Sequence, residues 1–259
     1  MDFNTLLFEK NEGIGVLTLN RPKQLNALND ELLQELSDIM DVIAADKEVK
    51  ALIITGGSKV FAAGGDIAFM STADFLSAES FITMCNQAFD KVAKLEIPVV
   101  AAIAKMALGG GCELSVCCDI RIASEGTIFG QPEINLGIIP GAGGTQRLQR
   151  LLGVGWGKYI TMLGEPFDTD TAFRIGLINK VVPLDDLMTE AMRVANALAA
   201  KSPVALTALK KSINYGVNVD LNSGLLYEQK TFASLFATED QKEGMKAFLE
   251  KRKPVFKGC

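Results

Sequence analysis

The chain carries near its middle the run Leu108-Gly109-Gly110-Gly111-Cys112-Glu113, followed by Gly130-Gln131-Pro132-Glu133. Three successive glycines leave the backbone unshielded and free to adopt positive φ, and the residues after them are typical of the first turns of a buried helix. The start of such a helix offers free N–H groups and a partial positive charge to a bound oxygen. Taken alone, the run fits a plain glycine hinge packed against a strand equally well.

A second glycine turn favours a functional interpretation. It is Phe61-Ala62-Ala63-Gly64-Gly65-Asp66-Ile67, and it follows the strand-like run Ala51-Leu52-Ile53-Ile54-Thr55. Amides from two separate loops can form an oxyanion hole, which is often the largest electrostatic contribution in acyl-group chemistry. The two glycine runs therefore predict a site that polarises a substrate carbonyl, with the carboxylates of Glu113 and Glu133 beside it.

The chain contains no histidine among its 259 residues. This excludes Ser-His-Asp and Cys-His nucleophilic catalysis, histidine-ligated metal sites and histidine general bases. Carboxylates are then the expected groups for proton transfer. Two carboxylates held close together do not titrate independently, and one of them is expected to be protonated near neutral pH. The sequence does not distinguish the donor from the acceptor.

The five cysteines show no C-x-x-C spacing and are odd in number, so we interpret all of them as reduced packing residues. They are Cys85, Cys112, Cys117, Cys118 and Cys259. Cys112 lies at the predicted helix start, where a thiolate is favoured, but a nucleophilic cysteine needs a basic partner that a chain without histidine does not supply.

Composition favours a cytoplasmic enzyme with a substantial core. Hydrophobic residues make up 48% of the chain, and the formal net charge of -5 disfavours nucleic acid as the main partner. No apolar run reaches the roughly 18 residues that a membrane span needs. The first residues, Met1-Asp2-Phe3-Asn4, lack the basic and apolar stretches of a secretory leader.

Hydrophobic periodicity predicts an α/β core followed by helices. Strands are expected at residues 6–11, 15–20, 51–55 and 98–103, and strand–helix alternation continues through residues 119–123 and 141–152. Asn29 is expected to cap a helix with one apolar face. From residue 184 onward only helices are predicted, at residues 184–200, 203–215, 220–236 and 239–251. We therefore expect a core of residues 1–183 and a helical C-terminal region of residues 184–259.

Five motifs follow one another along the chain. They are Asn20-Arg21-Pro22-Lys23-Gln24-Leu25-Asn26-Ala27-Leu28, Ala63-Gly64-Gly65-Asp66-Ile67, Ala107-Leu108-Gly109-Gly110-Gly111-Cys112-Glu113-Leu114, Phe129-Gly130-Gln131-Pro132-Glu133 and Ile139-Pro140-Gly141-Ala142-Gly143-Gly144-Thr145-Gln146-Arg147-Leu148. The set resembles the enoyl-CoA hydratase/isomerase (crotonase) superfamily over nearly the whole chain. One segment departs from the hydratase pattern, because Ala104-Lys105-Met106 stands where Asn-Gly and an aromatic or similar residue are usual.

The resemblance implies a role for each part of the site. The N–H groups of Gly65 and Gly110 would be the oxyanion donors, and Glu113 and Glu133 would be the paired catalytic carboxylates of the hydratase branch. It also implies a repeated ββα spiral core, with the helical C-terminal region packing in trimers that usually pair into hexamers. The expected substrate-binding residues are Lys23, Ala27, Ala63, Gly65, Asp66, Ile67, Gly110, Pro132 and Gly141.

The expected activity is that of a hydro-lyase of fatty acid metabolism. It would add water to a 2-enoyl-CoA or dehydrate a 3-hydroxyacyl-CoA such as 3-hydroxybutyryl-CoA, with coenzyme A as part of the substrate and with no resident cofactor or metal. Bulky residues after the second glycine turn indicate a short acyl chain, and residues 141–144 are expected to back the loop of Glu133. The bulky residues are Phe69, Met70, Phe75, Phe81 and Met84.

Other functions remain open. A 3-enoyl to 2-enoyl CoA isomerase would use the same oxyanion loops without consuming water, and so would a crotonase-type hydrolase or decarboxylase of CoA esters. A nucleic-acid binding or scaffolding protein that kept the fold is a third class. The acidic balance of the chain and the intact carboxylate pair disfavour that class.

Overall fold

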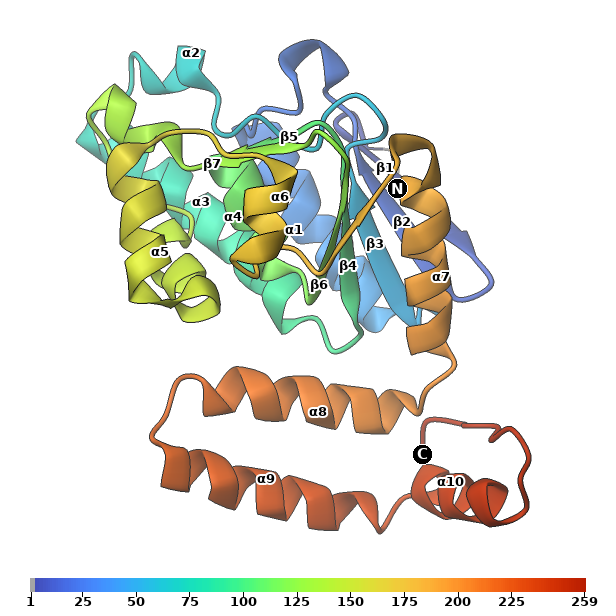
Figure 1. Ribbon diagram of the computed structural model, residues 1–259. Helices are drawn as coiled ribbons and strands as arrows, with labels where there is room; N and C mark the ends of the chain where they lie inside the picture. Colours follow the sequence, from blue (N-terminus) through green and yellow to red (C-terminus); the bar gives the residue numbers. More distant parts are fainter. Residues whose placement is uncertain (1–2) are drawn as a thin grey trace.

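A six-stranded sheet forms the centre of the molecule (Figure 1). The computed structural model describes residues 3–259. Its strands are β1 (Leu6–Asn11), β2 (Ile14–Leu19), β3 (Ala51–Thr55), β4 (Val99–Ile103), β5 (Met106–Leu108), β6 (Ile120–Ser124), β7 (Ile128–Gly130) and β8 (Lys180–Val182). The main sheet has the order β1-β2-β3-β4-β6-β8, and only the β1–β2 pair is antiparallel. β5 and β7 form a second, short parallel sheet.

Helices cover both faces of the main sheet. They are α1 (Asp30–Ala45), α2 (Ile67–Met70), α3 (Phe75–Lys94), α4 (Gly110–Cys117), α5 (Gln149–Leu163), α6 (Thr169–Arg174), α7 (Leu187–Ala199), α8 (Pro203–Gly216), α9 (Leu221–Leu235) and α10 (Glu239–Leu249). Short 3₁₀ turns lie at Pro22–Gln24, Pro132–Leu136 and Leu184–Asp186, and a π-helical turn lies at Gly144–Leu148. No helix within residues 3–259 is both long and apolar enough to cross a membrane.

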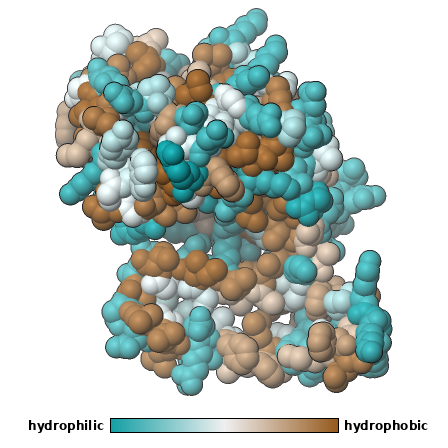
Figure 2. All heavy atoms as spheres, in the orientation of Figure 1, coloured by the Kyte–Doolittle hydropathy of each residue, from teal (hydrophilic) through white to brown (hydrophobic). Residues whose placement is uncertain are grey.

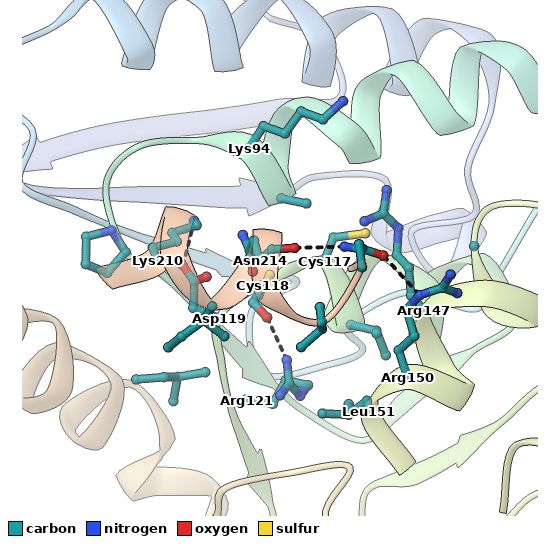
Figure 3. A pocket seen from close by; sticks show the side chains of 18 of the residues that line it. Lys94, Cys117, Cys118, Asp119, Arg121, Arg147, Arg150, Leu151, Lys210 and Asn214 are labelled. Carbon is teal, nitrogen blue, oxygen red and sulfur yellow. Dashed lines mark hydrogen bonds and ion pairs between the residues drawn. The ribbon is translucent and has the colours of Figure 1, made fainter. Parts of the chain in front are cut away.

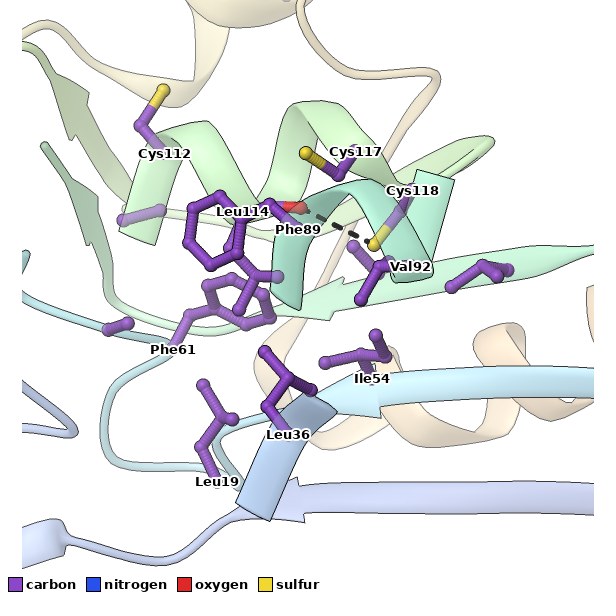
Figure 4. Packing of buried hydrophobic residues seen from close by; sticks show 14 of the residues in the cluster. Leu19, Leu36, Ile54, Phe61, Phe89, Val92, Cys112, Leu114, Cys117 and Cys118 are labelled. Carbon is purple, nitrogen blue, oxygen red and sulfur yellow. Dashed lines mark hydrogen bonds between the residues drawn. The ribbon is translucent and has the colours of Figure 1, made fainter. Parts of the chain in front are cut away.

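Alternate residues of the central strands point to two separate hydrophobic clusters. In β3, Leu52 and Ile54 pack with residues of α1, α3 and α4, whereas Ala51 and Ile53 pack with residues of α7. Figure 4 shows the first cluster, in which Ile54 lies near Leu36 of α1. Every residue of β3 and β4 is buried. Burial on both faces explains why these parallel strands are almost continuously apolar in sequence.

The predicted α/β class is confirmed, and several elements match closely. β1 and β3 have the predicted bounds of residues 6–11 and 51–55. Asn29 caps α1, because its Oδ1 accepts a hydrogen bond from the Leu32 N–H at 3.1 Å. The helix then buries one apolar face against the sheet, as its periodicity predicts.

Two kinds of helix follow residue 184. α7 lies against the main sheet and buries Leu187, Ala191 and Ala195. In contrast, α8 and α9 bury no residue in this chain. Figure 1 shows α8, α9 and α10, in orange to red, set apart from the core, and we call residues 203–259 the arm. The division into residues 1–183 and 184–259 stays a prediction.

Repeated units place the loops of interest at one edge. β4 lies in the main sheet and the next strand, β5, lies in the short sheet before α4 begins; β6 and β7 repeat this pattern. A parallel bridge from Ala62 to Ala107 adds the segment after β3 to the short sheet. Three successive units therefore end side by side, because the carboxyl ends of parallel strands meet at the same edge.

Lys105 occupies the bend between β4 and β5 with a φ of 59°. This is the left-handed region, which glycine adopts without strain and other residues adopt at a cost. The side chain of Lys105 is exposed, and its carbonyl accepts a hydrogen bond from the Ile128 N–H at 2.9 Å. The departure from the family pattern therefore leaves the strand pairing intact while straining one residue.

Candidate active site

The two glycine loops present two free N–H groups to the same space. A Cβ built on Gly110 would lie 3.8 Å from the nitrogen of Gly65, and one built on Gly64 would lie 3.7 Å from the nitrogen of Gly110. Within residues 3–259, neither the Gly65 N–H nor the Gly110 N–H donates a hydrogen bond to the protein. Both donors are thus available to an oxygen that enters between the loops.

The loop of residues 25–28 fixes the first donor. The Leu28 N–H donates to the Gly64 carbonyl at 2.8 Å, and the Asp66 N–H donates to the Leu28 carbonyl at 2.9 Å. Gly65 lies between these two bonds with its own N–H directed elsewhere. Asn26 is fully buried and donates to the carbonyls of both Val60 and Phe61 at 3.0 Å. These bonds hold the glycine turn of residues 61–67 against the loop of residues 25–28.

Glu113 lies in the first turn of α4 and is buried, with 3% of its surface exposed. Its Oε1 accepts a hydrogen bond from the Gly144 N–H at 2.6 Å. Burial raises the pKa of Glu113 to about 7, and the negative charge of Glu133 acts in the same direction. The N–H groups of Gly144 and Ala142 and the charge of Arg147 oppose this rise.

Glu133 follows Pro132 in the 3₁₀ turn after β7 and is half-buried. A Cβ built on Gly109 would lie 2.7 Å from its Oε1, so the carboxylate faces the central glycine loop. Burial raises the pKa of Glu133 above its usual value. The buried amide of Gln131, with its nitrogen turned toward Glu133, lies 3.1 Å from both carboxylate oxygens and can donate to them.

The two acids come from successive units and lie close enough to interact. Glu133 faces Gly109, Glu113 faces Gly144, and the negative charge of Glu133 contributes to the raised pKa of Glu113. Two carboxylates with raised pKa values can hold one proton between them near neutral pH, which leaves one acceptor and one donor beside the free N–H groups. Such an arrangement can polarise a carbonyl and transfer protons on one face of a substrate.

The other predicted binding residues do not all lie together. Three of them lie where the loop of residues 25–28 pairs with the second glycine turn, namely Ala27, Ala63 and Asp66. Arg21 lies 3.7 Å from Asp66. Lys23 is exposed on the turn just before them. Ile67 is exposed at the start of α2, Pro132 starts the turn of Glu133, and Gly141 lies against Ile82 of α3.

Residues 141–144 contact both segments that carry the acids. A Cβ built on Gly144 would lie 3.2 Å from the side-chain amide of Gln131, in the loop of Glu133, which agrees with the predicted backing role. The Gly144 N–H also binds the carboxylate of Glu113, which was not predicted. The glycine at this position is required, because an added Cβ would lie 2.9 Å from Oε1 of Glu113 and 2.6 Å from Cβ of Pro140. The contact of Gln131 with Glu133 was not predicted, because the only signal for it in the sequence is a polar residue directly before Pro132-Glu133.

The cysteines are free thiols, as predicted, and four of the five are buried. Burial raises the pKa of Cys112 to about 12, so its thiol is protonated at neutral pH and a nucleophilic role is disfavoured. Cys259 differs from the prediction, because it is exposed rather than packed.

Comparison with known proteins gives a consistent result. The family model described as enoyl-CoA hydratase/isomerase matches residues 9–259. The chain is 46% identical to a short-chain-enoyl-CoA hydratase of Clostridium acetobutylicum, over 98% of this chain and 97% of that protein. It is 45% identical to a crotonyl-CoA hydratase of Syntrophomonas wolfei, over 99% of each protein.

A solved structure supports the same assignment. The crystal structure of an enoyl-CoA hydratase from Bacillus anthracis superposes with a TM-score of 0.95 at 38% identity, covering 99% of this chain and 100% of that one. The likeness therefore includes the arm as well as the core. On the matching family model, the full-length relatives and the shared fold, the chain belongs to the enoyl-CoA hydratase/isomerase family.

Proposed function

We propose that this protein is an enoyl-CoA hydratase, which adds water across the 2,3 double bond of a short-chain 2-enoyl-CoA and catalyses the reverse dehydration. The observation that carries the proposal is the convergence of two free N–H groups and two carboxylates with raised pKa values on one site. The names of the relatives from C. acetobutylicum and S. wolfei support a short-chain substrate.

In the proposed reaction, the thioester oxygen lies between the N–H groups of Gly65 and Gly110. Attack of water at C3 moves electron density onto this oxygen, so the two donors stabilise the transition state more than the substrate. Glu113 and Glu133 exchange the protons: one accepts a proton from the attacking water while the other donates a proton to C2. The shared proton of the pair supplies both states at neutral pH.

We propose that the substrate extends from the exposed turn that carries Lys23 into the core. Lys23 and Ala27 would contact the coenzyme A part, where the ammonium group of Lys23 can interact with phosphate. The rings of Phe69 and Phe81 lie 5.2 Å apart beside the oxyanion loop, and their bulk favours a short acyl chain. The remaining proposed contacts are Ala63, Asp66, Ile67, Pro132 and Gly141.

We also propose that the arm mediates assembly into trimers or hexamers. Exposed apolar side chains lie along α8 and α9, and Figure 2 shows apolar residues over the arm beside the hollow that separates it from the core. Such a large apolar surface is unusual for a monomer. The prominent residues are Leu209, Ile213, Leu221, Leu225, Leu226, Phe232 and Phe236. Cytoplasmic location and the lack of a resident cofactor or metal stay predictions.

The direct test is the ultraviolet absorbance of crotonyl-CoA mixed with the purified protein. Hydration destroys the conjugated thioester chromophore, so the absorbance is expected to fall. Glu113→Gln and Glu133→Gln should each lower kcat by about a thousandfold or more while binding of a CoA ester survives. Full hydration by both variants would refute the proposal.

The same variants separate hydration from isomerisation. A 3-enoyl to 2-enoyl CoA isomerase would leave crotonyl-CoA unchanged and would convert a 3-enoyl-CoA, with only one of the two substitutions severe. Full activity on 3-enoyl-CoA combined with no hydration would therefore assign the chain to the isomerase branch.

A further inference from the structure

The π-helical turn Gly144–Leu148 lies against α4 and supplies the N–H that binds Glu113. It begins after Gly143, whose φ of 114° is in the left-handed region and whose carbonyl accepts the N–H groups of both Gln146 and Arg147. Turns of this width are rare and frequently occur at functional sites. The position of the Gly144 N–H therefore depends on what holds this turn in place.

Arg147 ties the turn to α3. Its Nη2 donates to Oδ1 of Asp90, and its Cδ and Nε would lie 3.0 Å from a Cβ built on Gly143, so the side chain packs directly over the start of the turn. The amide of Gln149, with its nitrogen turned toward the turn, can donate to the Gly144 carbonyl at 2.7 Å. The side chains of Arg147 and Gln149 therefore both hold the start of the turn.

Arg147 approaches Glu113 from outside the glycine-loop site. It lines the separate cleft of about 920 Å³ between the core and α8, a cleft that neither Glu113 nor Glu133 lines. Figure 3 shows Arg147 beside Cys117, one helical turn after Glu113 on α4. The positive charge of Arg147 lowers the pKa of Glu113 against the larger opposing influence of burial. Arg147 therefore touches neither the free N–H groups nor the reacting space, yet it acts on Glu113.

We propose that Arg147, anchored on Asp90, is a positioning residue that holds the Gly144 N–H against Oε1 of Glu113 and so leaves Oε2 to exchange the proton during hydration. The inference rests on the proposed hydratase function. A carboxyl group that accepts a fixed hydrogen bond on one oxygen carries its proton on the other, so the bond at 2.6 Å selects the reactive oxygen.

Other groups around Glu113 are accounted for. Glu133 is the other acid of the pair and Arg147 is the cation that faces Glu113; the neighbouring thiols have a pKa of about 12 and stay neutral through the pH range of the test. These thiols are Cys85, Cys112 and Cys117. A change in the titration of Glu113 after substitution of Arg147 is therefore assigned to Arg147 and the turn.

The test is kinetic and uses crotonyl-CoA with the full chain. Arg147→Gln should lower kcat about tenfold or more while KM changes less than about twofold, because the carboxyl group of Glu113 is misplaced but the substrate contacts remain. It should also move the limb of the pH profile that reports Glu113 upward by about 0.5 unit or more, since the charge that favours ionised Glu113 is lost. Arg147→Lys should restore the pH limb but only part of kcat.

Three further variants test whether Asp90 acts through Arg147. Asp90→Asn should lower kcat, and the double variant with Arg147→Gln should be no worse than Arg147→Gln alone, because Asp90 acts through Arg147. Lys94→Gln is the matched control: Lys94 also pairs with Asp90, at 2.6 Å, but is 76% exposed and does not contact the turn. Its kcat and pH profile should equal those of the wild type.

The proposal would be overturned if folded Arg147→Gln kept both the kcat and the pH profile of the wild type. It would also be overturned if the losses in kcat of Asp90→Asn and Arg147→Gln added up in the double variant. If Arg147→Gln does not fold, Arg147→Lys is measured instead, and a wild-type kcat in that variant would overturn the proposal. A protein that does not hydrate crotonyl-CoA would refute the hydratase function alone. The titration of Glu113, read from the pH dependence of the melting difference between Glu113→Gln and its parent, would still report whether Arg147 acts on it.

Discussion

The glycine-loop site and the arm differ in how closely their residues pack within one chain. Around the site, Gly111 lies so close to the neighbouring segment that an added Cβ would sit 2.2 Å from the Ala62 carbonyl oxygen. In the arm, a Cβ on Gly216 would meet nothing within 4 Å. The glycine-loop site is closely packed within a single chain, whereas the arm leaves large apolar side chains exposed. This difference is the one expected if the first region carries the chemistry and the second packs against other subunits, as proposed above.

The largest expected effect tests this contrast with one substitution in each region. Gly111→Ala should destabilise the fold by about 4 kcal/mol or more or prevent folding, because backbone atoms of the Ala62–Ala107 bridge must move. Gly216→Ala, at the end of α8, should change stability by less than about 1 kcal/mol. Thermal melts of the two variants check both values. Equal melting temperatures would abolish the contrast.

Glu113→Gln should stabilise the protein at alkaline pH. Because the folded state raises the pKa of Glu113 from 4.5 to about 7, the wild type loses stability as pH rises through this range. At about pH 8 the variant should therefore be the more stable by up to about 3 kcal/mol, and below about pH 4.5 the difference should vanish. Denaturant titrations at several pH values measure this, and a difference that does not depend on pH would contradict it.

In the arm, the sharpest test is Phe232→Ser. Phe232 is 64% exposed on α9, so the substitution should leave the fold of one chain intact. If the side chain is covered in the assembly, its loss should weaken association by about 1.5–3 kcal/mol per subunit. Light scattering over a dilution series should show dissociation at higher concentrations than in the wild type. Lys230→Ser, exposed on the same helix, should assemble normally.

The smallest expected effect concerns backbone strain near the site. Lys105→Gly should stabilise the protein by up to about 1 kcal/mol, because φ of 59° is unstrained for glycine. Lys59→Gly, exposed in a turn without positive φ, should lose about 0.5 kcal/mol through added freedom of the unfolded chain. Melting temperatures of the two variants should move in opposite directions, and a shared direction would remove the strain argument.

The sequence predicted the parts of the molecule whose signals are local. Asn29 and the apolar face after it define α1, and the uninterrupted apolar run of β3 marks a strand buried on both faces. The five motifs were sufficient to identify the family, while the roles that they assign to Glu113 and Glu133 stay predictions. Each of these signals lies within a few neighbouring residues.

Contacts between distant segments were not predictable in the same way. β5 and β7 have only three residues each, too few for a periodic pattern. The bond from Gly144 to Glu113 joins positions 31 residues apart, and nothing in a glycine run indicates which acid it will face. α7 carries the same helical pattern as the arm but packs on the sheet, because its small residues fit that face.

The exposed thiol of Cys259 has a practical consequence. The other four cysteines are buried, burial raises the pKa of each thiol well above its usual value, and all four are expected to be inert to maleimides at neutral pH. A fluorophore added under those conditions would attach at one known place, next to α10. Its emission would then report in real time whether subunits associate as proposed, without any engineered mutation.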